Sequence, residues 1–509
     1  MVMLVIMVIG VVTILVSSLN SSTTQTGRME TTSHSLAIAK DALISLAVTY
    51  NDYPGSLPCP DTNDDCESDA GGTTGCPQYI GRLPWKTLGL TDLRDASGER
   101  LWYALSRNVR RYAAVRPLNS DTEGTLNITG SYAVSNLYAV IFAPGDALAG
   151  QNRSASQSVL CTTTGTTIIA SRCASNYLEG SNANKSTEAN PVAGVNPNPN
   201  YQANVANNTF NDQLIFITKQ QLFSSVEKRI GREAKICLDG FAIANGNKYP
   251  WAVPVSNPTV SELSTGRNGT LFGRFPTLIP AQVEDMRTKF VLLQITLDNF
   301  IASNTSANYS AMVNAANQAE NSADSVAHFY NDTGNDPAED AAKVLEDAAD
   351  DISDFSVTVT IASVSAAQVD LTNKINNFNN IVPNSWPNCP LFASAYWNDW
   401  KNLVFFQIAN GFKPGGSGLC TGCGSCLSVQ GSGHSNAGSG NYLAVVVVAG
   451  EKLISGTRAT GVVGDYLEAS NLLPKDDATK PYMTYRSPDE VSLPNNDLVF
   501  CVDGKVNCV

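Results

Sequence analysis

The first fifty residues change from an uncharged, apolar pattern to an amphipathic one. No residue before Arg28 is charged. As a helix, the apolar segment Met1–Val16 would be about 24 Å long, slightly less than the roughly 30 Å hydrocarbon core of a bilayer. Farther along, apolar residues recur at helical spacing, at Leu36, Leu43, Leu46, Ala47 and Tyr50. The pattern predicts a stem helix over residues 1–50, apolar in its first half and amphipathic in its second.

From the second half of the stem onward, segments of the sequence occur twice in the same order. The segment AKDALISLAVTYNDYPGSLP begins at Ala39, and AKICLDGFAIANGNKYPWAVP begins at Ala234. Four further segments match in the same order, including NYLEGSN and DYLEASN. They pair residues 79–84 with 271–276, 139–153 with 444–458, 176–182 with 465–471, and 211–217 with 496–502. Five ordered matches predict a tandem duplication of one module, with copies over residues 33–218 and 227–509.

Each module begins with a helix and continues with strands. The segments LYAVIF and YLAVVVV are β-branched and apolar, which is typical of buried strands. A helix followed by strands that bury one face against it predicts an α+β head with an antiparallel sheet. The second copy has an insertion at residues 277–384. Between Ala281 and Asn380 this insertion has fifteen Asp and Glu against four Lys and Arg, and its spacing predicts an acidic helical subdomain.

An apolar N-terminal segment that continues into an amphipathic helix and an α+β head resembles the mature type IV pilins and pseudopilins. The segment lacks the basic flank and cleavage site of an ordinary signal peptide, so we expect either an upstream start or a basic leader already removed. In that family the apolar half holds the subunit in the inner membrane, then packs in the filament core. The resemblance implies that the N-terminal helix contacts other pilin or pseudopilin subunits, in the periplasm or on the surface of a bacterium.

One departure from the family narrows this expectation. Major pilins carry a glutamate five residues into the mature chain, but no acidic residue occurs here before Glu30. The minor pseudopilin at the tip of secretion pseudopili also lacks this glutamate and carries a helical insertion. The resemblance therefore implies a minor pilin or pseudopilin of a type IV pilus or type II secretion-like filament. Its role would be non-enzymatic, in filament assembly, adhesion or secretion.

Two other functions remain open, a signal-anchored exported surface adhesin outside any filament and a membrane-anchored periplasmic enzyme. Catalysis has little support, because the histidines are His34, His328 and His434 alone, and no nucleophile-elbow, phosphate-loop or zinc-protease motif occurs. The formal net charge of −13 argues against a nucleic-acid partner, which would require a basic face.

The chain has twelve cysteines, and several of them lie close together in segments rich in turn-forming residues. This pattern predicts disulfides in an oxidising compartment, the alternative being reduced, buried cysteines in a cytosolic protein. We expect Cys161 to pair with Cys173 and Cys501 with Cys508. One further pair is expected among Cys59, Cys66 and Cys76.

An acidic loop is the main candidate for metal binding. In PDTNDDCESDAGG, oxygen ligands alternate at Asp61, Asn63, Asp65, Glu67 and Asp69, a pattern that suits calcium. However, Cys66 stands where an EF-hand loop has glycine, and Gly72 stands where the bidentate acid belongs. A solvated acidic turn held by disulfides is the favoured alternative.

Two other segments are weaker metal candidates. NDTGNDPAED (Asn331–Asp340) is a second candidate for calcium. The segment CTGCGSC contains Cys420, Cys423 and Cys426, and zinc would require a fourth ligand, which Cys389 or His434 could supply. Disulfides are the favoured interpretation for these cysteines.

The repeated Tyr-Leu-Glu motif also has two interpretations. Tyr177, Glu179, Tyr466 and Glu468 could form a ligand site used twice. The favoured interpretation is a structural corner in each module, in which Tyr and Leu pack while Glu and Asn bind turn amides.

Overall fold

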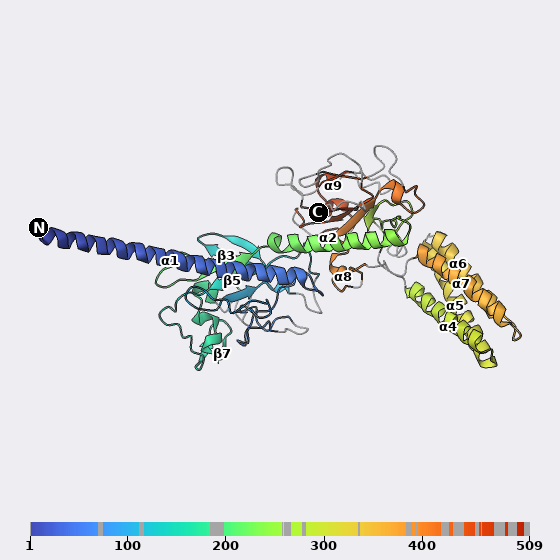
Figure 1. Cartoon of the computed structure of the whole chain (residues 1–509), viewed down its shortest axis with the longest axis horizontal. Helices are drawn as coiled ribbons and strands as arrows, with labels where there is room; N and C mark the ends of the chain where they lie inside the picture. The colour runs from blue at the N-terminus through green and yellow to red at the C-terminus, as the bar shows by residue number, and fades with distance from the viewer. Residues whose placement is uncertain are drawn as a thin grey trace. The chain divides into compact units, whose positions relative to one another are not determined.

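The structure is a computed structural model in which the chain forms two compact units, Met1–Val226 and Glu227–Val509. Figure 1 shows their elements in chain order. In α1 the side chains are described from residue 25 onward. The described backbone comprises residues 2–69, 75–110, 117–183, 198–256, 258, 266–276, 281–333, 336–382, 389–392, 394–418, 427–430, 442–453, 458–459, 461–472, 484–486 and 496–502.

The N-terminal helix α1 (Val2–Thr49) has 48 residues. The C-terminal half of α1 packs on the first sheet, chiefly on strands β5 and β9 (Figure 1). Its buried side chains follow the helical period along one face, at Thr32, Ser35, Leu36, Ala39, Leu43 and Ala47. The buried Ser35 hydroxyl donates to the carbonyl oxygen of Arg94 at 2.7 Å. Among the described residues, no helix is both long and apolar enough to cross a membrane.

The first sheet is antiparallel and has its four strands in chain order. They are β1 (Ile80–Arg82), β2 (Trp102–Leu105), β5 (Ala139–Ala143) and β9 (Gln213–Ile217). Every residue of β5 is buried, because α1 packs against this central strand. In the register, Ile141 pairs with Tyr103 on one side and Ile215 on the other. The strand predicted at LYAVIF is β5.

The second sheet has the same strand order and direction. Its strands are β10 (Phe272–Arg274), β11 (Val404–Ile408), β13 (Ala444–Val448) and β15 (Leu498–Val502). Val446 pairs with Phe406 and Phe500. The helix before this sheet is α2 (Lys219–Ala244), and Gly231 lies so close to β15 that an added Cβ would be 2.0 Å from the Phe500 ring. The strand predicted at YLAVVVV is β13.

Smaller elements extend each unit. In the first unit, β3 (Leu126–Gly130) pairs with β4 (Val134–Leu137) and β8 (Asn200–Ala203), and β6 (Ser158–Cys161) pairs with β7 (Thr166–Ile169). The second unit contains α8 (Trp397–Trp400), α9 (Ala469–Leu472), β12 (Ser428–Gln430) and β14 (Thr484–Arg486). The 3-10 helices are η2 (Arg107–Val109), η3 (Ala170–Arg172), η4 (Ala174–Asn176), η5 (Gly180–Ala183), η6 (Asn410–Phe412) and η7 (Val463–Asp465).

The predicted helical insertion is a bundle. Its helices are α4 (Ala281–Ala302), α5 (Ser306–Thr333), α6 (Asp336–Ser353) and α7 (Ile361–Ile381). One face of each helix is buried in a shared core that includes Phe290, Tyr330, Leu345 and Phe378. Alanines fill much of the α5 and α6 faces of that core, which allows the two helices to pack closely.

Three disulfides indicate an oxidising, extracytoplasmic location. Cys161 pairs with Cys173 as expected, and Cys59 pairs with Cys76, one of the three pairings left open by the sequence. Cys66 keeps a buried thiol. The third disulfide, Cys237–Cys389, was not predicted, and it occupies a cysteine considered as a zinc ligand. Cys501 is buried on β15, whereas Cys508, Cys420, Cys423 and Cys426 lie outside the described residues, so the Cys501–Cys508 pair stays a prediction.

Candidate functional site

In the first unit, the Tyr-Leu-Glu motif places an aromatic ring between two arginines. The Arg82 guanidinium, from the end of β1, lies 4.1 Å from the Tyr177 ring centroid. The Arg153 guanidinium, from the loop after β5, lies 4.6 Å from the same centroid. Trp102 on β2 packs beside Tyr177, with centroids 5.3 Å apart. Burial lowers the pKa of Arg82, but its charge is compensated by cation–π contacts and by two carbonyl oxygens that accept from it.

The second unit has the same arrangement. Tyr466 lies 5.1 Å from the Arg274 guanidinium and 5.0 Å from that of Arg458. Phe405 on β11 takes the place of the tryptophan, with ring centroids 5.4 Å apart. Arg458 also donates to the carbonyl oxygens of Asp465 and Gly450, at 2.8 and 2.5 Å. Arg153 makes equivalent bonds in the first unit, to the carbonyl oxygens of Asn176 and Gly145.

Two carboxyl groups meet behind the tyrosine in the first unit. The Glu179 amide and the Asn182 side-chain amide both donate to Asp212 Oδ2, at 2.9 Å each. In return, the backbone amides of Asn211 and Asp212 donate to Glu179 Oε2, at 3.0 and 3.2 Å. Gln151 donates to Glu179 Oε1 at 2.6 Å. This set of hydrogen bonds attaches the motif to the start of β9, and we name Glu179 with Asp212 the first acid pair.

Glu468 and Asp497 form the second acid pair. The Glu468 amide donates to Asp497 Oδ2 at 3.0 Å, and the Asn471 side-chain amide donates to the same oxygen at 3.2 Å. The Asn496 backbone amide donates to the Glu468 carboxylate. Asp497 is completely buried. These bonds attach the second motif to the start of β15.

The acid pairs have perturbed titration. Burial, followed by the negative charge of Glu179, raises the pKa of Asp212 well above its ordinary value. Burial and then Glu468 do the same to the pKa of Asp497. Desolvation disfavours the charged form of a carboxyl group, and a like charge nearby adds to the effect.

The motif residues thus have the geometry expected of a structural corner. Tyr177, Leu178 and Asn182 are buried, as are Tyr466, Leu467 and Asn471. Their polar atoms bind backbone and side-chain groups of the same unit. The repeated YLE and ND segments contain both residues of each acid pair. The sequence analysis did not predict that the two segments contact each other.

The acidic loop brings three of its predicted ligands together. Asp61, Asp65 and Asp69 each offer a carboxylate oxygen within 4.8 Å of the others, so they could hold a hard cation such as calcium. Asn63 Oδ1 accepts from the Asp65 amide and Asp65 Oδ1 from the Glu67 amide. In the first unit, Asp61 also forms an antiparallel backbone bridge with Arg82. The corresponding bridge of the second unit joins Val253 to Arg274, so a valine stands where the first unit has the aspartate.

The same loop is also organised without a metal. Asp61 accepts from the backbone amides of Asn63, Asp64 and Cys66, at 3.1, 2.7 and 2.9 Å. Burial raises the pKa of Asp61, and these amides oppose the shift. Asp64 and Cys66 have positive φ angles of 71° and 72°, so the side chain of Asp61 stabilises a backbone conformation that is otherwise unfavourable.

We expect Asp61→Ala to destabilise the first unit by about 2–3 kcal/mol in the presence of a chelator, because three amides lose a charged acceptor. Chemical denaturation followed by hydrogen exchange in the first unit would measure this. Asp52→Ala, at an exposed position nearby, is the control. Equal stability of the two variants would contradict the structural role of Asp61. A wild-type midpoint that rises with calcium, and an Asp65→Asn midpoint that does not, would show that the loop also binds a cation.

The weaker metal candidates are not assembled in the described residues. Of the segment Asn331–Asp340, the described part forms the ends of α5 and α6, and Glu339 pairs with Lys343 at 2.5 Å. Cys389 is not available to zinc because it is bonded to Cys237. His434 lies outside the described residues. His34 is exposed on α1, and exposed His328 pairs with Asp324 at 3.0 Å.

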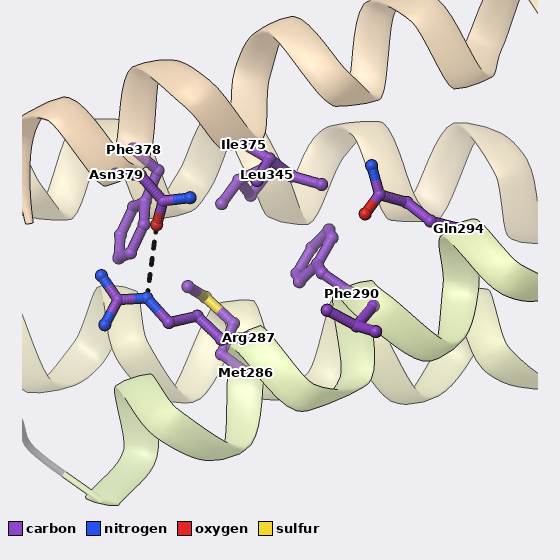
Figure 2. Close-up of a pocket in the computed structure, with 9 residues that line it drawn as sticks. Met286, Arg287, Phe290, Gln294, Leu345, Ile375, Phe378 and Asn379 are labelled. Carbon is purple, nitrogen blue, oxygen red and sulfur yellow. Dashed lines mark hydrogen bonds between the residues drawn. The ribbon is translucent and has the colours of Figure 1, made fainter. Parts of the chain in front are cut away.

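The helical bundle contains a small apolar pocket between α4 and α7, which Leu345 of α6 also lines. Figure 2 shows Phe290 and Met286 facing Ile375 and Phe378 across it, with Arg287 at one end. Arg287 donates to Asn379 Oδ1 at 3.3 Å and lies over the Phe378 ring. The volume of about 70 Å³ is well below the roughly 300 Å³ of small-molecule sites. The pocket is a packing defect of the bundle rather than a ligand site.

No family model matches the chain, and no curated protein or solved structure matches it either. Inference about function therefore depends on the helix α1, the two sheets with their corners, the insertion and the disulfides.

Proposed function

We propose that this chain is a minor pilin-like or pseudopilin-like subunit of an exported bacterial filament, acting in filament assembly, adhesion or secretion. The observation that carries the proposal is α1. It is a single helix of 48 residues, and among its side chains from residue 25 onward the first buried one is Thr32. About thirty residues, or roughly 45 Å of helix, therefore precede the packed half. A subunit held in a membrane and then in a filament core requires such a stem.

The two sheets support a second part of the proposal, the duplication of one head. Each unit has a helix followed by four antiparallel strands in chain order. Each also has a tyrosine between two arginines and an acid pair behind it. These similarities coincide with the five repeated sequence segments. The second head's helix, α2, has 26 residues and lacks an apolar extension, as expected of a second head on one stem.

A terminal or rare position fits the chain better than the main repeating position. The residues after the stem number more than four hundred, and stems must pack closely in a filament core. Heads of this size would crowd one another on every subunit. No acidic residue before Glu30 is available to bind the terminal amine of a neighbouring subunit.

Purified filaments from the producing bacterium would test the proposal. We expect a few copies of this chain for each filament by quantitative mass spectrometry, located at one end by immunogold labelling. Deleting residues 2–16 should abolish the association, while the heads keep their disulfides. Presence in membranes but never in filaments would contradict the proposal and favour the surface adhesin. A filament built from this chain alone would contradict the terminal position only.

A further inference from the structure

The first acid pair has a feature that packing does not explain. Asp212 is only 5% exposed, and its Oδ1 atom is buried without a described hydrogen-bond partner. Its other oxygen already accepts two hydrogen bonds. An unpaired, buried carboxylate oxygen is costly, but a protonated one is a donor. Glu179 is the adjacent acceptor, and the two side chains are within hydrogen-bonding contact.

The surrounding charges do not neutralise the first pair. Arg153 is linked to Glu179 through Gln151, and its charge is itself paired with Glu99 at 3.1 Å. Asp146 is joined to the corner through its carbonyl oxygen, which accepts from Asn211. The pair is therefore more stable with one proton than with two negative charges.

The second pair has similar surroundings. The positive charge of Arg458 acts on Glu468, but its guanidinium donates to the carbonyl oxygens of Asp465 and Gly450. The carboxylate of Asp465 is paired with Lys452 at 3.3 Å. The Glu451 carbonyl oxygen accepts from Asn496. The same arrangement thus occurs in two heads whose other side chains differ.

We propose that each acid pair, Glu179 with Asp212 and Glu468 with Asp497, shares one proton at neutral pH, and that this proton is a pH-sensitive lock between the Tyr-Leu-Glu corner and the last strand of its sheet. Acid closes the lock and alkali opens it. The inference concerns each head by itself and holds whether or not the chain enters a filament.

The sign follows from proton linkage. The raised pKa of Asp212 means that the folded corner keeps its proton where an unfolded carboxyl group, with a pKa of about 4, has lost it. Stability from the proton is therefore complete at low pH. It falls as the pH rises from about 4 to the raised pKa, and is lost above it. For one proton, the opening constant of a corner rises by up to about tenfold for each pH unit in that window.

Two measurements on the full chain test the proposal. Infrared spectroscopy should detect protonated carboxyl groups at neutral pH, reduced in Asp212→Asn and in Asp497→Asn. Hydrogen exchange at the Asn211 and Asp212 amides, corrected for intrinsic rates, should show the corner opening more often as the pH rises. Asp212→Asn, which resembles the protonated acid, should remove this dependence in the first corner and leave the second unchanged. Asp497→Asn should do the reverse.

The two heads serve as controls for each other. Absence of a protonated carboxyl signal at neutral pH would overturn the proposal, and so would an unchanged pH dependence of the first corner in Asp212→Asn. If that variant does not fold, Glu179→Gln provides the same test. Without the negative partner, the pKa of Asp212 should fall although burial still raises it, so the pH dependence of the first corner should move to lower pH. An unmoved pH dependence would also overturn the proposal.

Discussion

Replacing Cys237 by serine should lower the free energy of unfolding of the second unit by about 3–5 kcal/mol. The Cys237–Cys389 disulfide has a sequence separation of 152 residues, and a loop of that length corresponds to about 5 kcal/mol in the chain-entropy model. The helical bundle lies inside this loop, and any order that it keeps after the sheet unfolds shortens the effective loop. Cys237 is fully buried on α2, so serine, which is similar in size, changes the packing little.

Denaturant unfolding followed by hydrogen exchange in α2 and β11 would measure this loss. The control is Cys161→Ser with Cys173→Ser, because that disulfide closes only 12 residues and should contribute about 3 kcal/mol to the first unit. A loss of less than 1 kcal/mol in Cys237→Ser would contradict the prediction. Destabilisation of the wild type by a zinc chelator would also contradict the prediction, because it would indicate that Cys389 binds zinc instead of forming the disulfide.

The parts of the fold with local signals were predictable from the sequence. β5 and β13 are runs of β-branched, apolar residues that have buried neighbours on both sides. The second half of α1 shows its contact face directly, since Leu36, Leu43 and Ala47 are buried on one side. The insertion was predicted to be helical for the same reason, its 3.6-residue spacing and its many alanines. In each case the signal lies within one element.

The parts that depend on distant residues were not predictable in the same way. Cys237 and Cys389 are 152 residues apart in the sequence, so their disulfide depends on the fold of the second unit and not on any local pattern. Glu179 and Asp212 are 33 residues apart, and single acids in loops are normally solvated. One signal could have joined them, because a YLE segment is followed by an ND segment twice, at residues 176–182 and 211–217 and again at 465–471 and 496–502. Two motifs that recur together in the same order are candidates for contact.

Gly231 on α2 is a second position where a single methyl group should have a large effect. An added Cβ would be 2.0 Å from the Phe500 ring, far inside a normal contact. At the corresponding positions of the first unit, from the alignment of Ala39 with Ala234 and Asn211 with Asn496, the residues are Leu36 and Ile215. A small helix residue thus accompanies a large strand residue in one sheet, and two residues of intermediate size occur in the other.

We therefore expect Gly231→Ala to destabilise the second unit by about 1–3 kcal/mol, the usual cost of overpacking. This loss would occur although alanine favours a helix over glycine by about 1 kcal/mol. Gly27→Ala on α1, where nothing lies within 4 Å of the added Cβ, should instead be neutral or stabilising. Adding Phe500→Ile to Gly231→Ala should restore part of the loss, because the smaller side chain vacates the space that the methyl group needs. The wild type, the two single variants Gly231→Ala and Phe500→Ile, and the double variant are compared by chemical denaturation. An equal effect of Gly231→Ala with and without Phe500→Ile would show that α2 and β15 are not in contact at these residues.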